Sequence, residues 1–255
     1  MKAAALCALL LLAVAAPGCG RGASEPVPEL SVAAAADLRY AFEELAPRFE
    51  ARCGCRLRLT FGSSGMLAAQ IEQGFPADVF FSADVGYVDR LVREGLGQPD
   101  SVTVYALGRI VLATPARAGN RLGRLEELAS AGIRAVAIPN PEHAPYGVAA
   151  RQALQAAGLW EALQTKLVLA ENAAQAVQFV ESGDADAGIV PLSLAIARGS
   201  ALSYVRIDDA LYVPLRQAAV VLLSSPRAEL AAEFIAYTVS DAGRAVLERY
   251  GFEVP

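Results

Sequence analysis

Residues 30–46, which read LSVAAAADLRYAFEELA, decide the fold class of this 255-residue chain. The first part, up to Ala36, is a mostly apolar run of strand length, as in a strand that is buried on both faces of a sheet. The second part places apolar side chains such as Leu38 and Phe42 at helical spacing. Asp37 lies at the junction. A buried strand that leads through a short junction into a helix is the first half of a βαβ unit.

The same alternation continues outward along the chain. Further strands are expected at 56–61, 78–82, 134–138, 166–170, 187–190 and 217–223, and further helices at 66–73, 85–94, 147–157, 174–182, 227–238 and 241–249. This alternation predicts an α/β fold with mostly parallel sheets that are covered by helices on both faces. Pro47 predicts a kink or a restart in the first helix, because proline lacks a backbone donor.

Two β-rich segments, 102–114 and 213–223, are longer than ordinary strands. They are long enough to leave one sheet and enter another. We therefore predict a discontinuous first lobe, residues 30–106 and 216–255, and an inserted second lobe, residues 107–215.

The N-terminal segment has the layout of an export signal. Lys2 precedes an apolar run at residues 3–16, which is shorter than the about 20 apolar residues that a membrane-spanning helix needs. We expect residues 1–18 to be a signal peptide and residues 19–29 to be a linker. Cys19 stands where a lipoprotein carries its lipid, but the usual leucine three residues earlier is absent, so lipid anchoring and simple cleavage both stay open. Both outcomes place the folded part in the periplasm or on the outer face of the cytoplasmic membrane.

The charge balance and the cysteines exclude several classes of function. The formal net charge is −5 at pH 7, which argues against a nucleic-acid partner and attracts no anion from a distance. Cys53 and Cys55 fall in the folded part, and with His143 as the single histidine they cannot supply a four-ligand zinc site without carboxylates. We expect the pair to have a structural role, and both a disulfide and two free thiols stay open.

Four strand-to-helix junctions have compositions that suit an anion, at residues 33–37, 62–65, 143–147 and 171–173. Each opens a helix, whose first N–H groups lack partners and whose dipole is positive at that end. Taken singly, each junction is an ordinary cap or turn. An anion site is predicted only if the four junctions converge in space.

Five segments, which follow one another over residues 30–252, carry a family resemblance. They read VAAAADL at 32–38, FGSSG at 61–65, PADVFFSAD at 76–84, PEHAPYG at 141–147 and ERYGF at 248–252. Together they resemble the periplasmic molybdate-binding protein family. The resemblance implies a type II periplasmic-binding-protein fold, in which two lobes joined by two crossover strands close on a tetrahedral dianion. It implies neither enzymatic activity nor a cofactor.

The resemblance also implies which residues contact the anion. The family's contacts fall on Ala36 and Asp37 in the first loop, on Ser64, on Tyr146 in the second-lobe loop and on Ala173 at a helix start, with Ser63 and Asn172 as their neighbours. These contacts are neutral hydrogen-bond donors to the oxygens of molybdate or tungstate. No residue is expected to bind a metal ion directly.

Two positions depart from the family pattern. Asp37 stands where many members have a serine, and a carboxylate repels a dianion. We therefore predict that Asp37 contributes its backbone N–H while its side chain turns back to cap the following helix. Pro191 stands where some members have a tyrosine that reaches the ligand. We hypothesise that Tyr146 supplies this hydroxyl from the other side of the cleft.

The resemblance implies a monomeric binding protein that delivers molybdate or tungstate to an ABC importer, formed by a membrane permease and its ATPase. The sequence does not rank the two anions, because they are similar in size. One alternative is a relative tuned to another anion, such as sulfate or phosphate. A more distant alternative is a secreted serine hydrolase that uses Ser63 or Ser64 with His143, although the G-x-S-x-G motif is absent.

Overall fold

The structure, a computed structural model, describes residues 27–119 and 121–255. The predicted signal peptide and Cys19 lie outside these residues. The strands are β1 (Glu29–Ala35), β2 (Arg56–Gly62), β3 (Val79–Ser82), β4 (Thr103–Gly108), β5 (Ile110–Pro115), β6 (Val136–Pro139), β7 (Leu167–Ala170), β8 (Ala187–Pro191), β9 (Leu202–Arg206) and β10 (Leu215–Val221). The α-helices are α1 (Arg39–Cys53), α2 (Ser64–Glu72), α3 (Val85–Arg93), α4 (Pro145–Ala156), α5 (Trp160–Leu163), α6 (Ala173–Ser182), α7 (Leu192–Ala197), α8 (Ala228–Thr238) and α9 (Asp241–Arg249). None of the helices in the described ranges has the length and apolar character to cross a bilayer.

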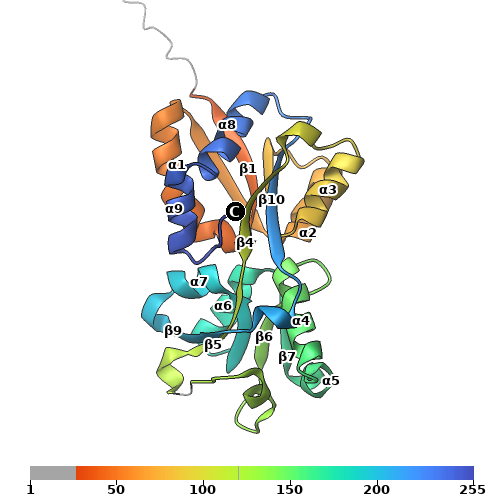
Figure 1. The fold of residues 1–255 in the computed structure, drawn as a ribbon, viewed down its shortest axis with the longest axis vertical. Coiled ribbons are helices and arrows are strands. Elements are labelled where there is room, and N and C mark those ends of the chain that lie inside the picture. Colours follow the sequence, from red (N-terminus) through yellow and green to blue (C-terminus); the bar gives the residue numbers. More distant parts are fainter. Residues whose placement is uncertain (1–26, 120) are drawn as a thin grey trace, which may run out of the picture.

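Two α/β lobes are stacked along the long axis of the molecule (Figure 1), and each is built on one sheet. The first sheet has the strand order β2-β1-β3-β10-β4, and the second has the order β7-β6-β8-β5-β9. In the first sheet β1 pairs in parallel with β2 and β3, and in the second β6 pairs in parallel with β7 and β8. The other pairings, made by β10 and β5, are antiparallel. The predicted two-lobed α/β fold is confirmed, with mixed rather than mostly parallel sheets.

Helices cover both faces of each sheet, because alternate strand residues point to opposite sides. In β1, Val32 and Ala34 pack with α1, α8 and α9, whereas Ala33 packs with α2 and α3. In β5, Leu112 packs with α4, whereas Val111 packs with α6 and α7. Burial on both faces explains why these strands read as continuous apolar runs in the sequence.

The first helix differs from its prediction at Pro47. α1 runs through Pro47 as one helix, so the expected restart does not occur. Pro47 is exposed, and water can reach the carbonyl that loses its backbone donor. Cys53, the last residue of the helix, forms a disulfide with Cys55. Gly54 between them has a φ of 63°, a left-handed conformation that favours glycine at the end of a helix.

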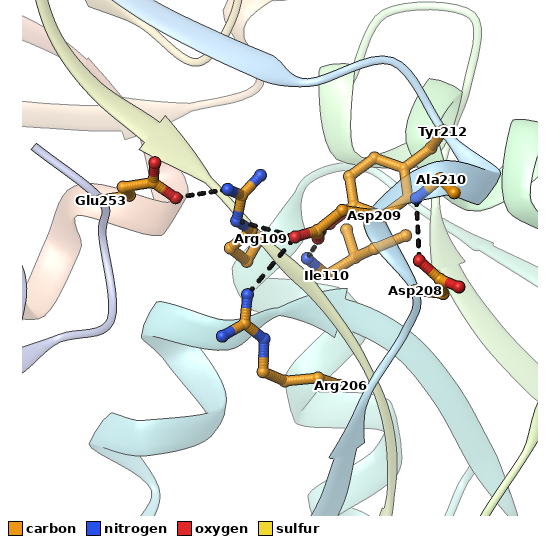
Figure 2. A network of polar contacts seen from close by, with 8 residues as sticks. All are labelled: Arg109, Ile110, Arg206, Asp208, Asp209, Ala210, Tyr212 and Glu253. Carbon is orange, nitrogen blue, oxygen red and sulfur yellow. Dashed lines mark hydrogen bonds and ion pairs between the residues drawn. The ribbon is translucent and has the colours of Figure 1, made fainter. Parts of the chain in front are cut away.

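The chain crosses between the lobes at Arg109, which separates β4 from β5, and again between β9 and β10. A polar network surrounds these crossings (Figure 2). Arg109 forms ion pairs with Glu253 of the C-terminal tail and with Asp209, whose Oδ2 lies 3.4 Å from Nε. Asp209 also pairs with Arg206 at 3.5 Å and accepts a hydrogen bond of 2.6 Å from the Tyr212 hydroxyl. We call these five residues the hinge network.

Candidate functional site

A small cavity lies between the lobes, where strand-to-helix junctions from both lobes meet. Residues 35–37, 62–64 and 83 line it from the first lobe, and residues 144–146 and 173 line it from the second. The space open to the centre of a water molecule is about 10 Å³, which is room for about one water. The lining includes every predicted site residue except Asn172, namely Ala36, Asp37, Ser63, Ser64, Tyr146 and Ala173. The junctions converge, and the contact of these residues with a ligand stays a prediction.

Three α-helices begin at the cavity. α2 begins at Ser64, α4 at Pro145 and α6 at Ala173, and each of these residues lines the cavity. The first N–H groups of a helix have no partner within the helix, and the helix dipole is positive at this end. The lining contains no lysine or arginine. These helix starts present backbone N–H groups from both lobes, and no cation, to the cavity, which is an arrangement that suits an anion.

Ser64 has a hydroxyl hydrogen to offer to a ligand. Its side chain is buried, and Oγ accepts a hydrogen bond of 2.9 Å from the Ala83 N–H. A hydroxyl oxygen that accepts such a bond still has its own hydrogen to donate. Among the described residues the Ser64 hydroxyl makes no second hydrogen bond. This geometry suits a donor that faces an anion in the cavity.

Ser63 and Gly65 hold the two walls of the cavity together. Oγ of Ser63 lies 2.8 Å from Nδ1 of His143 in the second lobe, and the Gly65 N–H donates to the His143 carbonyl at 2.9 Å. A Cβ at residue 65 would lie 2.6 Å from that carbonyl oxygen. Only glycine allows the two lobes to approach this closely at this point.

The Asp37 side chain does not cap the following helix, contrary to the prediction. Neither the 3₁₀ turn η1 (Ala36–Leu38) nor α1 has a side-chain cap. Oδ2 of Asp37 instead accepts hydrogen bonds from the Tyr146 hydroxyl in the second lobe, at 2.8 Å, and from Nε2 of Gln217 in β10, at 2.7 Å. The Asp37 carbonyl accepts a further bond of 3.0 Å from the Ser193 hydroxyl of α7. Donors from distant parts of the chain have replaced the local cap.

The hydroxyl of Tyr146 is committed to this contact. It donates to Asp37 and accepts a hydrogen bond of 2.9 Å from Nε2 of Gln217. Gln217 in turn accepts a bond of 2.8 Å from the Tyr105 hydroxyl. The hypothesis that the Tyr146 hydroxyl donates to the ligand is therefore not supported by this geometry, although Tyr146 lines the cavity. We call Asp37, Tyr105, Tyr146 and Gln217 the cleft network.

The carboxyl group of Asp37 is buried among neutral donors. Burial raises the pKa of Asp37 from 3.8 to about 6, and the hydrogen bonds from Gln217 and Tyr146 oppose this rise only in part. The N–H groups of Asp37 and Leu38 also lower the pKa. Neither reaches Oδ1 with hydrogen-bond geometry, and Oδ1 is a buried oxygen without a hydrogen-bond partner in the described part of the chain. Buried polar atoms of this kind are rare in folded proteins.

Asn172 stands behind the cavity rather than in its lining. Its Oδ1 accepts hydrogen bonds from the N–H groups of Ala174 and Gln175, at 3.0 and 3.1 Å, and thereby caps α6. Ala173, the first residue of that helix, reaches the cavity. Pro191 ends β8 and is not part of the lining. The role of Asn172 is therefore to order the helix end that Ala173 presents.

Gln217 and Ser193 were not among the predicted site residues. Gln217 is fully buried in β10 and lies 180 residues from Asp37 in the sequence. Its sequence signal is an amide side chain directly before the apolar run 218–223, since a buried amide needs hydrogen-bond partners. Ser193 carries no comparable signal, because a serine near a helix start is common.

Comparison with known proteins identifies the family. Residues 30–253 match the family described as bacterial extracellular solute-binding protein. The chain belongs to this family. This solute-binding protein is 33% identical to the molybdate-binding protein ModA of Rhodobacter capsulatus. The alignment spans 226 residues and covers 88% of each chain.

Solved structures agree with the family assignment. The periplasmic molybdate-binding protein of Azotobacter vinelandii superposes with a TM-score of 0.84 at 33% identity, over 89% of this chain and 99% of that chain. The sulfate-binding protein SubI of Mycobacterium tuberculosis H37Rv superposes with a TM-score of 0.76 at 16% identity, over 89% of this chain and 87% of that chain. The second likeness shows the fold alone. Solute-binding proteins named for different anions therefore share this architecture, and the fold does not choose the ligand.

Family membership makes this chain a binding protein and not an enzyme. The contact between Ser63 and His143 is the pair that the hydrolase alternative required. A catalytic histidine also needs a partner that orients its second ring nitrogen. That nitrogen of His143 has no hydrogen-bond partner among residues 27–119 and 121–255. Ser63 caps α2 instead, through a 3.4 Å bond from the Met66 N–H.

Proposed function

We propose that this solute-binding protein captures a tetrahedral oxyanion, molybdate or tungstate, in the cavity between its lobes and delivers it to an ABC importer. The observation that carries the proposal is the convergence of three helix N-termini and the Ser64 hydroxyl on one cavity. Neutral donors arranged in this way replace the water shell of an anion without a counter-charge. The relatives named for molybdate support the choice of ligand.

A crowded donor shell is needed, because a dianion that loses its water is costly to bury. Each hydrogen bond to a charged group contributes about 1.5 to 3 kcal/mol, so on the order of six are required. We assign them to backbone N–H groups around Ala36, Asp37, Tyr146 and Ala173 and to both donors of Ser64. The closed cavity has room for about one water, so entry of a four-oxygen anion requires the lobes to move apart.

Delivery requires partners that the family reading supplies, namely a membrane permease and its ATPase. We assign to the protein a monomeric state and a place outside the cytoplasmic membrane. The lipid at Cys19 belongs to the same proposal, with simple cleavage as its alternative. The mass of the mature N-terminus separates these two outcomes.

Titration calorimetry with molybdate, tungstate, sulfate and phosphate tests the choice of ligand. We expect molybdate and tungstate to bind most tightly, because the relatives that are 33% identical to this chain are named for molybdate. Ligand at about 100 times its dissociation constant should stabilise the fold by about 2.7 kcal/mol, visible as a rise in melting temperature. No response to any of the four anions would contradict the proposal, and tighter binding of sulfate or phosphate would favour the alternative ligand.

Ser64→Ala tests the proposed site. Loss of the hydroxyl donor should weaken molybdate binding by about tenfold to a hundredfold, the equivalent of one hydrogen bond to a charged group. Ser101→Ala is the matched control, because Oγ of Ser101 accepts the Val221 N–H at 2.9 Å, as Ser64 accepts Ala83, but outside the cavity. The control should retain full affinity. Equal losses in the two variants would assign the effect to folding rather than to the ligand.

A further inference from the structure

Asp37 is an acidic side chain in the lining of a cavity that the proposed function fills with an anion. The side chain is 2% exposed, Oδ2 receives two neutral donors and Oδ1 has no hydrogen-bond partner. An ionised carboxylate and a dianion in such a cavity repel each other strongly, since little water screens them. A neutral carboxyl group would instead add a donor. The two negative groups can share the cavity only if one of them acquires a proton.

We propose that the cavity binds its oxyanion together with one proton, which Asp37 takes up from solvent as the anion enters. The inference rests on the proposed function and gives Asp37 a part in specificity. The neutral carboxyl group donates its O–H to an oxygen of the anion. Asp37 thereby replaces the serine hydroxyl that the family resemblance leads one to expect at this position.

The cleft network decides which oxygen carries the proton. The Tyr146 hydroxyl and Nε2 of Gln217 both point a hydrogen at Oδ2, at 2.8 and 2.7 Å. Gln217 is held in this orientation by the Tyr105 hydroxyl, which donates to its Oε1. Because Oδ2 already accepts two hydrogen bonds, the proton goes to Oδ1. This is the oxygen without a partner.

Neutral side chains face Asp37 from the elements packed against it. They are Tyr146 of α4, Tyr105 of β4, Gln217 of β10 and Ser193 of α7. Burial raises the pKa of both tyrosines well above its usual value, so their hydroxyls stay protonated. Within the described residues no cation makes an ion pair with Asp37, and burial, opposed in part by hydrogen bonds, already raises its pKa to about 6. A neighbouring dianion raises that pKa further.

Proton uptake makes the site sensitive to the protonation state of its ligand. A fully deprotonated anion such as molybdate or sulfate draws the proton from solvent. An anion that carries a proton, such as hydrogen phosphate, brings it along and can donate it to Oδ1 of an ionised Asp37. The proton count of the complex is the same in both cases, but only the first case shows proton uptake on binding.

Calorimetric titration of the protein with molybdate, between about pH 6.5 and about pH 8.5, tests the inference. Molybdate stays a dianion over this range. Uptake of one proton raises the dissociation constant by about tenfold per pH unit, or about a hundredfold over the range. Titrations in two buffers of different ionisation enthalpy should give one proton per bound anion. Asp37→Asn should bind without proton uptake and with a dissociation constant that does not change with pH.

Asp78→Asn is the matched control. Asp78 is also buried in the first lobe, at 4% exposed, but it bonds to the Ser31 N–H and the Ser225 hydroxyl away from the cavity. This variant should keep the pH slope of the wild type. Tyr146→Phe, which removes a hydrogen bond that lowers the pKa of Asp37, should move the onset of the slope to higher pH.

Two failures can be told apart. Molybdate binding by the wild type with no pH slope and no proton uptake would overturn the inference and leave the proposed function intact. The same slope in Asp37→Asn as in the wild type would also overturn it. A wild type that binds none of the four oxyanions would overturn the proposed function and the inference together.

Discussion

Two carboxylates lie where the lobes of this protein meet, and only one of them has cations as partners. Asp209 of the hinge network pairs with two arginines, Arg109 and Arg206, and its side chain is 41% exposed. Asp37 of the cleft network is almost fully buried, and its hydrogen-bond donors, Tyr146 and Gln217, are neutral. The hinge therefore holds a compensated charge near solvent, and the cleft holds an uncompensated one in the interior.

The difference in charge compensation indicates which of the two networks stabilises the fold and which takes part in ligand binding. Ion pairs near solvent contribute at most about 1 kcal/mol, because water screens them. A buried carboxylate without a cation lowers stability whenever it is ionised. A perturbed group of this kind in a cleft is a mark of a functional site. The cleft network thus fits a role in binding, and the hinge network fits a role in holding the lobes in register.

The largest expected effect comes from removing the charge in the cleft. Because the pKa of Asp37 rises from 3.8 to about 6 on folding, the folded protein holds this proton more tightly than the unfolded chain. The stability from this group is therefore highest at low pH and is lost as pH rises from about 4 to about 6. At about 1.4 kcal/mol per pKa unit, the loss is about 3 kcal/mol.

Asp37→Asn should abolish that loss. Denaturant unfolding of the wild type and of the variant, at about pH 4 and about pH 8, measures this change. Between these pH values the free energy of unfolding should fall by about 3 kcal/mol more in the wild type than in the variant. The other carboxyl groups are present in both proteins, so their contribution to the loss cancels when the two losses are subtracted. Equal losses of unfolding free energy in the two proteins would mean that the charge of Asp37 is compensated. The cleft network and the hinge network would then not differ in this respect.

An intermediate effect is expected where the lobes touch beside the cavity. Gly65→Ala would place a Cβ 2.6 Å from the His143 carbonyl and 2.8 Å from the Tyr87 hydroxyl. Overpacking of this kind costs about 1 to 3 kcal/mol. The open form escapes the contact with His143, because that residue belongs to the second lobe. Anion affinity should therefore fall by about fivefold to a hundredfold. Gly132→Ala, where a Cβ meets nothing within 4 Å, is the control and should bind as the wild type does.

Small-angle scattering with saturating anion checks the cause. Gly65→Ala should stay more extended than the wild type at the same occupancy. An unchanged affinity would show that the contact between Gly65 and His143 does not accompany ligand binding.

The smallest effect is expected in the hinge network. Glu253→Gln removes one of the two carboxylates that face Arg109, and the Glu253 side chain is 58% exposed. The free energy of unfolding should fall by about 0.5 to 1 kcal/mol at low salt and by less at high salt. Anion affinity should stay within about twofold of the wild type. A loss of affinity greater than that of Gly65→Ala would reverse the comparison and give the hinge a direct part in binding.

The order of strands and helices could be predicted from the sequence, because burial on both faces leaves a visible apolar run in strands such as β1. The direction of pairing could not. Ala218 of β10 pairs antiparallel with Ser82 and with Val104, and both partners lie more than a hundred residues earlier. Nothing in the residues of β10 records these neighbours. The mixed character of the sheets is therefore a property of the tertiary structure.

The site residues show the same division between local and distant information. Ser64 and Ala173 were predicted through the family resemblance, which rests on short segments, and each of them opens a helix. The direction of the Asp37 side chain was wrongly predicted, since the cap amides are its neighbours in sequence. Its actual partners, Tyr146 and Gln217, lie 109 and 180 residues away. The local capping preference of aspartate is therefore overridden by hydrogen-bond donors that come close only in the folded chain.

The first sheet draws its strands from both ends of the chain. β1 to β4 are made first, β5 to β9 of the other lobe follow, and β10 completes the first sheet. Gln217, which holds the Asp37 carboxylate, arrives only with β10. All strands of the second lobe are therefore synthesised before the sheet of the first lobe can be completed. The cleft is assembled last, from pieces synthesised at opposite ends of translation.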